Sequence, residues 1–319
     1  MEDKHQQTTD GQPITGKLPM ETGTLLARWC SLDANARVVV VADDGQQPLA
    51  RELAAALPRC EVLAFDRADG CLPALRGLAP GDLAVALLSF DTFVTGGGNR
   101  YFSPFAKPDG VKAKYAFVRL SISPHSLREG LSTPRALVQD IVTRLGRHPD
   151  GTRLRVTTAA GTDLTLAVHP FTTCSCEITE NGGMAFLPPS ETSAEVMPGS
   201  ACGVVAVDVT VGQLYHYGRL LGPFGLVNGP VTLWVDAGRV VDITGGAMAG
   251  ELKDQLFALH PACREVVELG HGLSALTATG LIGVDESMAS TCHIGIGDGG
   301  TCGVHLDVVL GHPTIAPAG

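Results

Sequence analysis

The run Val38-Val39-Val40-Val41 is an unbroken stretch of β-branched residues, which is typical of a strand buried on both faces. The segment 48–57 follows it, begins with proline and is rich in Ala and Leu, and this composition predicts a helix. Strands buried on both faces occur almost only in parallel sheets that helices cover on each side. The run therefore predicts an α/β fold for the first part of the chain.

The first half of the chain repeats this alternation of strand and helix. Apolar segments at 61–65, 83–89 and 115–122 predict further strands, and segments 24–32, 73–78 and 134–145 predict helices. Such alternation indicates a small doubly wound parallel sheet. We assign this N-terminal α/β domain to residues 1–150, and we expect the polar residues 1–20 to form a mobile arm.

The pattern changes near residue 150. Strand-like segments now follow one another between Gly- and Pro-rich turns, at 152–157, 163–168, 203–211, 231–235 and 239–244, with one helix at 250–259. Short strands joined by tight turns are typical of antiparallel sheets. We expect residues 151–319 to form a second domain, a curved and mainly antiparallel β-rich unit.

Composition excludes several classes of protein. Of the 319 residues, 45% are hydrophobic and 18% are charged, as in globular proteins and unlike disordered ones. The net charge of −10 and the lack of a basic patch argue against a nucleic-acid partner. No apolar run reaches the roughly 18–20 residues that span a bilayer, and the first 20 residues lack a secretion signal. The nine unevenly spaced cysteines favour free thiols and a cytoplasmic location.

Ligand-type side chains gather near the C-terminus, in three glycine-rich segments. They are Glu268, His271, His293, His305 and Asp307. In a strand, residues i and i+2 point to the same face, so His305 and Asp307 project together. With His271 as a third ligand they predict a two-histidine, one-carboxylate site, which suits a single Fe(II) ion; Zn²⁺ or Mn²⁺, as one or two ions, are alternatives.

A plainer reading of the same residues stays open. A His-x-Asp pair is common as a simple hydrogen-bonded pair, and a lone histidine such as His293 is usually a core residue with satisfied hydrogen bonds. Glycines beside the candidate ligands favour the metal site, because they let backbone approach a ligand closely and otherwise weaken strands.

Four motifs follow one another between residues 150 and 312: Gly161-Thr162-Asp163-Leu164-Thr165, Glu268-Leu269-Gly270-x-Gly272, Asp285-Glu286 through His293-Ile294-Gly295-Ile296-Gly297, and His305-Leu306-Asp307. In this order they resemble the motifs of the aminopeptidase T/S metallopeptidases. The resemblance implies the two-domain fold of that family, a homodimer or higher homo-oligomer, and a two-metal site. The residues that match its metal ligands are Glu268, Glu286, His293, His305 and Asp307.

The chain departs from the peptidase pattern at two positions. Met184, in Gly183-Met184-Ala185-Phe186, stands where the family has a metal-bridging glutamate, and a thioether does not bridge two hard cations. His271 stands where the family has an apolar residue. In this respect the chain is similar to the 2,5-dihydroxypyridine 5,6-dioxygenases, iron enzymes on the same scaffold, whose ligands correspond to His271, His305 and Asp307.

These features lead to one preferred function and several alternatives. The preferred one is a mononuclear non-haem Fe(II) dioxygenase that acts on a small hydroxylated (hetero)aromatic substrate with O₂. Glu268 and His293 would orient ligands or carry protons beside the metal. The alternatives are a metallo-aminopeptidase, another metal-dependent enzyme of secondary metabolism on the same scaffold, and a non-catalytic binding protein.

Several other residues attract attention, each with a plain structural interpretation beside the functional one. They are the pair Cys174-x-Cys176, the loop Gly96–Gly98, the stretch Tyr215-His216-Tyr217, the tryptophans Trp29 and Trp234, the arginines Arg119 and Arg219, and the histidines His125 and His312. For Arg119 and Arg219 we weigh a clamp on a substrate carboxylate against a surface salt bridge. We expect both tryptophans in the core.

Overall fold

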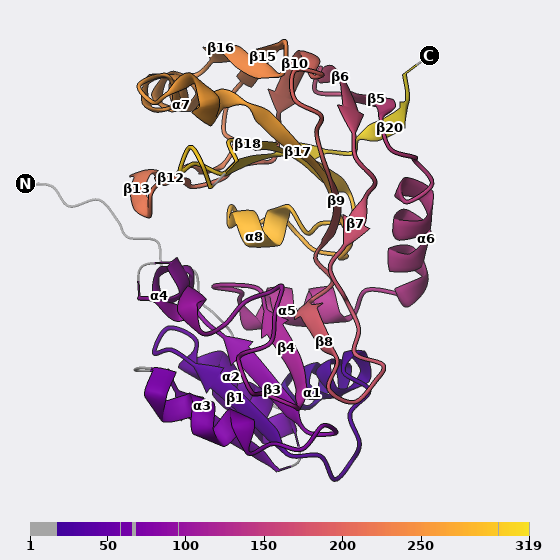
Figure 1. Ribbon diagram of the computed structural model, residues 1–319, viewed down its shortest axis with the longest axis vertical. Helices are drawn as coiled ribbons and strands as arrows, with labels where there is room; N and C mark the ends of the chain where they lie inside the picture. The colour runs from indigo at the N-terminus through magenta and orange to yellow at the C-terminus, as the bar shows by residue number, and fades with distance from the viewer. Residues whose placement is uncertain (1–17, 58, 66–67, 95, 299, 319) are drawn as a thin grey trace, which may run out of the picture.

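The computed structural model describes residues 18–57, 59–65, 68–94, 96–298 and 300–318. The chain forms two lobes, with the N-terminal lobe at the bottom of Figure 1 and the C-terminal lobe at the top. Most of the polar arm predicted at residues 1–20 lies outside the described residues; Leu18 already belongs to the first helix. Among the described helices, none has the length and apolar character required to cross a bilayer.

The N-terminal lobe is a parallel sheet with the strand order β2-β1-β3-β4-β8. Its strands are β1 (Val38–Ala42), β2 (Cys60–Ala64), β3 (Leu83–Leu87), β4 (Lys114–Val118) and β8 (Met184–Leu187). The strands β1, β3 and β4 are buried along their whole length, as the β-branched run predicted. Apolar clusters fill both faces of this sheet. The predicted doubly wound α/β lobe is confirmed.

Helices surround this sheet and lead from it to the second lobe. They are α1 (Leu18–Trp29), α2 (Gln47–Ala56), α3 (Ala68–Arg76), α4 (Phe90–Val94), the 3₁₀ turn η1 (Gly98–Arg100), α5 (Pro124–Leu131) and α6 (Arg135–Leu145). Ser123 caps α5, where its hydroxyl accepts a hydrogen bond from the backbone N–H of Ser126. The predicted boundary near residue 150 falls after α6, but β8 later returns to the N-terminal sheet and pairs with β4.

The C-terminal lobe consists of two antiparallel sheets and a small hairpin. Sheet B contains β5 (Thr152–Thr157), β6 (Asp163–Val168), β10 (Cys202–Val207), β15 (Val231–Asp236), β16 (Arg239–Gly245) and β20 (Thr314–Pro317). Sheet C contains β7 (Thr172–Thr173), β9 (Glu191–Glu195), β11 (Thr210–Val211), β14 (Gly225–Leu226), β17 (Val266–Gly272), β18 (Thr291–Ile296) and β19 (Leu306–Gly311). The hairpin is β12 (Leu214–His216) with β13 (Arg219–Gly222).

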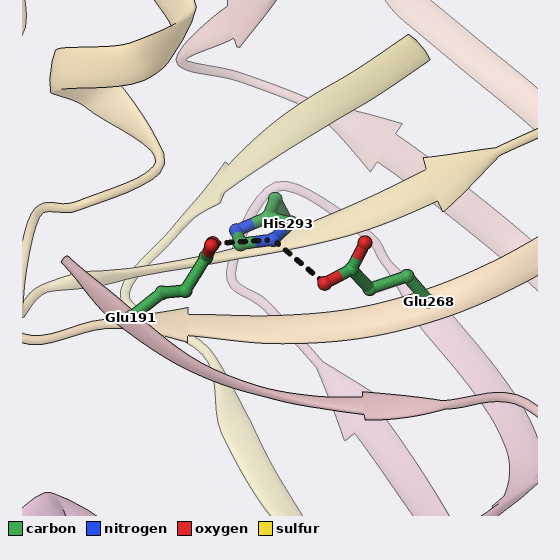
Figure 2. A group of neighbouring side chains, drawn as sticks. All are labelled: Glu191, Glu268 and His293. Atoms are coloured by element: carbon green, nitrogen blue, oxygen red, sulfur yellow. Dashed lines mark ion pairs between the residues drawn. The ribbon is translucent and has the colours of Figure 1, made fainter. Parts of the chain in front are cut away.

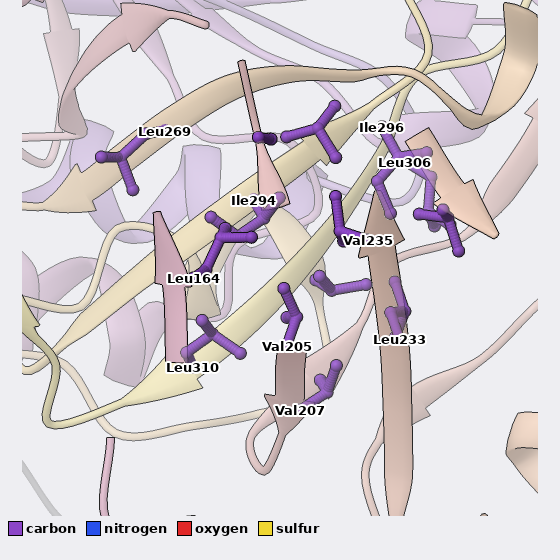
Figure 3. Close-up of a cluster of buried hydrophobic side chains, with 14 of the residues drawn as sticks. Leu164, Val205, Val207, Leu233, Val235, Leu269, Ile294, Ile296, Leu306 and Leu310 are labelled. Atoms are coloured by element: carbon purple, nitrogen blue, oxygen red, sulfur yellow. The ribbon is translucent and has the colours of Figure 1, made fainter. Parts of the chain in front are cut away.

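The core of the C-terminal lobe lies between sheets B and C. Sheet B contributes residues such as Leu164 and Val205, and sheet C contributes Leu269 and Ile294 (Figure 3). The helix α7 (Ala247–Phe257) joins the same cluster, whereas the one-turn helix α8 (Ile282–Asp285) and the 3₁₀ turn η2 (Pro261–Arg264) lie in the connections between strands. One face of sheet C therefore packs in this core, and the opposite face takes no part in it.

Candidate metal centre

The free face of sheet C carries the polar residues of the candidate site. In β17, Glu268 pairs with Gly295 of β18, which pairs in turn with Asp307 of β19. In the same way Gly270 of β17 pairs with His293 of β18. Directly paired residues share a face of the sheet. Neighbouring strands therefore bring together side chains that lie up to forty positions apart in the sequence.

Two glycines make the room that these side chains occupy. A Cβ atom on Gly295 would lie 2.7 Å from the Cβ of Glu268 and 3.3 Å from Oδ1 of Asp307. On Gly270 it would lie 2.1 Å from the imidazole ring of His293. Real Cβ atoms do not approach other atoms so closely, so any larger residue would displace a candidate ligand. The glycine-rich segments in the sequence thus serve the site directly.

Glu268, His305 and Asp307 form the first ligand group. One potential ligand atom from each lies within 4.8 Å of the other two. Nε2 of His305 is 3.4 Å from Oε2 of Glu268 and 3.3 Å from Oδ1 of Asp307. The other ring nitrogen, Nδ1, lies 3.0 Å from the carbonyl oxygen of Gly297. That hydrogen bond fixes the ring and turns Nε2 toward the carboxylates.

Glu191, Glu268 and His293 form a second ligand group beside the first, again within 4.8 Å. Figure 2 shows these three side chains pointing toward one another from three strands of sheet C. Nε2 of His293 lies 3.2 Å from Oε2 of Glu191 and 4.0 Å from Oε1 of Glu268. Glu268 belongs to both groups and contributes a different oxygen to each. Its carboxylate is therefore placed like a bridge between two cation positions.

Electrostatics within the cluster favour positive charge. The negative charge of Asp307 is the main cause that raises the pKa of His305 to about 12. Burial lowers the pKa of His293, but hydrogen bonds to Glu191 and Glu268 outweigh it and leave the value well above the ordinary one. Burial raises the pKa of Glu268, yet its two histidine partners hold it below its usual range. Both histidines thus hold protons that a bound cation would replace.

The donor set and its surroundings fit a divalent cation. Among the residues that the structure describes, no lysine or arginine forms an ion pair with Glu191, Glu268 or Asp307. Oδ1 of Asp307 and Nδ1 of His293 are buried and make no hydrogen bond. Carboxylates and imidazoles together suit Zn²⁺, Mn²⁺ and Fe(II). In the described part of the chain, the three half-buried carboxylates are balanced only by the protonated histidines, whose protons a metal ion can replace.

His271 does not join the other predicted ligands. It lies three residues after Glu268 on β17, and successive strand residues alternate between faces, so it points to the core side. There its Nδ1 lies 2.8 Å from the carbonyl oxygen of Gly272, and its side chain belongs to neither ligand group. Burial lowers the pKa of His271 from 6.5 to about 4. The predicted trio of His271, His305 and Asp307 is therefore not assembled, and Glu268 stands in the place expected for His271.

Glu191 is the ligand-type residue that the sequence analysis missed. It lies at the start of β9, 77 positions before Glu268, outside the window in which we sought ligands. Burial alternates along β9: Glu191 and Ser193 are half-buried, and Thr192 and Ala194 are buried. A strand period at 191–195 was the feature that could have pointed to Glu191. Met184, which stands where the resemblance to the peptidases expects a glutamate ligand, belongs to neither ligand group.

Glu286, which matches a further peptidase ligand, has a different partner. It forms a buried ion pair with Arg119, at 2.6 Å between Oε1 and Nη1, and Arg119 also donates a hydrogen bond to Oγ of Ser190. Arg119 follows β4 of the N-terminal lobe, whereas Glu286 follows α8 of the C-terminal lobe. Of our two readings for Arg119, neither the substrate clamp nor the surface salt bridge describes this buried pair between lobes.

The remaining candidates fall outside the two ligand groups. Cys174 lines the cleft beside them, Trp29 is buried as expected, and Trp234 is 45% exposed, contrary to our expectation. His125 faces Glu129 on the surface of α5. Gly98 begins the turn η1, and His216 ends β12 beside the ring of Tyr217. None of the nine cysteines is in a disulfide.

The ligand groups line a cleft of about 700 Å³ between the lobes. Residues on the opposite wall come from the N-terminal lobe and the segment before β8, among them Phe93, Phe105, Arg119 and Cys174. A cleft of this size between lobes is typical of small-molecule sites.

Comparisons with known proteins concern the fold. No protein-family model matches the chain, and no curated protein matches it. Two solved structures are similar over almost the whole length. For 2,5-dihydroxypyridine dioxygenase from Pseudomonas putida KT2440 the TM-score is 0.61 at 17% identity, over 94% of this chain and 93% of the other. For wild-type AmpT, an aminopeptidase T, from Thermus thermophilus it is 0.56 at 15% identity, over 93% and 94%. The chain thus has the aminopeptidase T-like fold that its C-terminal motifs predicted.

Proposed function

We propose that this chain is a metal-dependent hydrolase that binds two divalent cations in the cleft between its lobes. The observation that carries this proposal is the shared carboxylate of Glu268, which belongs both to the group with His305 and Asp307 and to the group with Glu191 and His293. A carboxylate between two cation positions is a feature of two-metal sites. Glu191 supplies a carboxylate that the sequence pattern lacks at Met184.

Bound cations supply Lewis-acid polarisation of a substrate carbonyl and a water of lowered pKa at such a site. Four of the five ligand side chains lie on neighbouring strands and His305 directly precedes β19, which keeps their spacing fixed. Glu286 lies on the wall of the same cleft, where burial raises the pKa of its carboxyl to about 7 and the ion pair with Arg119 opposes that rise. In this arrangement Glu268 and His293 are ligands instead of the proton carriers first expected.

A mononuclear Fe(II) oxygenase is the second candidate. It needs only the group of Glu268, His305 and Asp307. Two of these residues, His305 and Asp307, also line an aromatic cavity next to the cleft. The group of three has one histidine and two carboxylates, in contrast to the two histidines and one carboxylate expected with His271. One of the similar structures is a dihydroxypyridine dioxygenase, which supports this chemistry by analogy of fold alone. O₂ as a co-substrate, a homodimer and a cytoplasmic location remain predictions.

Cation stoichiometry separates the two candidates. Metal-free protein is titrated with Zn²⁺, Mn²⁺ and, without oxygen, Fe(II), and binding is followed by calorimetry and elemental analysis. Two cations per chain together with hydrolysis of aminoacyl anilides support the hydrolase. One iron per chain with oxygen consumption in the presence of aromatic diols supports the oxygenase, and a protein that binds no cation contradicts both.

Single substitutions locate the two cations. Glu191→Gln is expected to remove one cation and to keep the other, because Glu191 belongs to one ligand group only. Asp307→Asn removes the other cation, and Glu268→Gln weakens both. Glu195→Gln is the matched control: it makes the same chemical change on the same strand, at an exposed residue outside both groups. Equal loss of both cations in Glu191→Gln contradicts the two-cation proposal.

A further inference from the structure

A cavity of about 260 Å³ adjoins the ligand residues and continues from the cleft. His305 and Asp307 line both spaces, so the cavity opens directly beside the first ligand group. Its walls come from both lobes. The N-terminal sheet and its helices contribute Phe90, Phe93, Phe117, Leu120 and Phe186. The C-terminal lobe contributes Gly212, Gln213, Tyr215, Leu281, Ile282 and Gly283. A group bound here would have its neighbouring atoms at the cations.

Aromatic rings dominate the walls of this cavity. Phe117 contacts Phe186 with ring centroids 5.4 Å apart and planes at 79°, and it contacts Phe93 at 5.5 Å and 70°. On another side Phe90 packs against Tyr215 with centroids 5.3 Å apart. Aromatic rings of this kind attract a further aromatic ring in stacked or edge-to-face contact.

The charged side chains that line the cavity are paired with one another: Arg119 with Glu286 at 2.6 Å, and His305 with Asp307 at 3.3 Å. The guanidinium of Arg119 also lies 4.4 Å from the ring centroid of Phe186. A carboxylate or an ammonium group that entered this space would lose its hydration without a free counter-charge. The part of a ligand that occupies the cavity is therefore uncharged.

Three polar atoms of the wall residues make no hydrogen bond within the described part of the chain: Nε of Arg119, Oδ1 of Asp307 and Oε1 of Gln213. Only Gln213 among these residues has an uncharged side chain. The side-chain oxygen Oε1 of Gln213 is buried and accepts no hydrogen bond from the described part of the chain. Buried acceptors without partners are rare in folded proteins, because each loses its hydrogen bonds to water. A hydroxyl or N–H group on the ligand would satisfy this oxygen.

The size of the cavity limits the ligand further. A dry cavity of roughly 150 Å³ accepts benzene, and sites for larger ligands exceed roughly 300 Å³. A volume of about 260 Å³ therefore holds one ring with a short substituent. We propose that the cavity selects substrates with a single uncharged aromatic ring that bears a hydroxyl or N–H donor for Gln213. This inference rests on the proposed function only in placing the reacting group at the cations.

Hydroxamates of different size test the ring preference. Acetohydroxamate and benzohydroxamate share the same cation-binding group, and only the second carries a ring. Their affinities for the Zn²⁺-loaded protein are compared by calorimetry. We expect benzohydroxamate to bind between about tenfold and a hundredfold more tightly, from burial of the ring. Equal affinities overturn the inference, although the cation site itself would stand.

Variants locate the preference within the cavity. Tyr215→Ala removes a half-buried wall residue of the hairpin, and Gly283→Leu places a side chain in the space, where an added Cβ meets no atom closer than 3.7 Å. Both are expected to reduce the advantage of benzohydroxamate at least fivefold and to leave acetohydroxamate unchanged. Phe105→Ala is the matched control, because Phe105 is 75% exposed and lines the cleft without lining the cavity. A loss in the control as large as in Tyr215→Ala contradicts the assignment.

Gln213→Leu tests the hydrogen bond, because it keeps the approximate size and removes the acceptor. The 3- and 4-hydroxybenzohydroxamates are compared with benzohydroxamate. At least one of them is expected to bind about fivefold to tenfold more tightly to the wild type, and this gain disappears in Gln213→Leu. A gain that persists in the variant, or its absence in the wild type, overturns this part of the inference.

Phenol separates failure of the cavity from failure of the metal site, because it carries no chelating group. Its binding to the metal-free protein is followed by ligand-observed NMR. Binding that Gly283→Leu abolishes supports the cavity even where no hydroxamate and no cation binds, in which case only the proposed function falls. Absence of phenol binding together with equal hydroxamate affinities overturns the inference.

Discussion

On one face of β17 and β18 the side chains of Leu269 and Ile294 pack into the core, whereas on the other face Glu268 and His293 meet in the cleft. The same two strands thus serve two purposes through alternation alone. Residues on the core face stabilise the lobe, and residues on the cleft face bring carboxylates and histidines together. Neighbouring positions in these strands thus have different roles, one in packing and one in the candidate site. Substitutions on each face can test the two roles separately.

The largest expected effect lies on the core face. Ile294→Ala deletes a fully buried side chain and is expected to lower the free energy of unfolding by about 2–5 kcal/mol, measured by urea denaturation. The folded fraction should bind cations with the wild-type stoichiometry, because Ile294 points away from the ligands. If fully folded Ile294→Ala protein bound a different number of cations per chain, the two faces of the strands would not act independently.

The next effect lies on the cleft face. Gly295→Ala adds a methyl group 2.7 Å from the Cβ of Glu268, so that Glu268 must move away from its partners. We expect cation affinity to fall roughly a hundredfold, or about 2.7 kcal/mol, in a calorimetric titration. Gly250→Ala in α7 is the control, since an added Cβ there meets nothing within 4 Å. Wild-type affinity in Gly295→Ala would contradict the description of the ligand groups.

The smallest effect concerns His271, which was predicted as a ligand but lies on the core face of β17. Burial lowers its pKa from 6.5 to about 4, so the unfolded chain binds a proton more readily than the folded one. Stability is therefore complete above pH 6.5, and the contribution of this residue is lost progressively as the pH falls toward 4.

The variant His271→Gln is expected to show a weaker decline of stability over that pH range. Thermal or urea unfolding between pH 7 and pH 4 measures the difference from the wild type. Cation binding at pH 7 should stay unchanged in the variant. A cation affinity that drops as far as in Asp307→Asn would instead restore His271 as a ligand.

Periodicity in the sequence predicted much of the fold. The buried runs at Val38–Ala42 and Leu83–Leu87 and the hairpin of β5 and β6 follow from local composition, because each strand carries its own burial pattern. The strand β8 could not be predicted from local composition, since its four residues, Met184–Leu187, are too few to show a period. Its place beside β4 depends on pairing between residues about seventy positions apart.

The candidate site was predictable in part for a similar reason. The i, i+2 rule placed His305 beside Asp307, and the glycine-rich motifs marked Glu268 and His293. The same alternation places His271 on the opposite face of β17 from Glu268, because the two residues are an odd number of positions apart. The prediction of His271 as a ligand did not take this alternation into account. Glu191 belongs to a distant strand, and only the register between β9 and β17 brings it to the cluster.

The return of β8 to the N-terminal sheet has a mechanical consequence. The chain passes from one lobe to the other after α6, again into β8, and again out to β9. The stretch from Thr172 to Phe186, which supplies one wall of the cleft, is thus tethered at both ends to different bodies. A rotation of one lobe against the other would therefore also move this wall of the cleft.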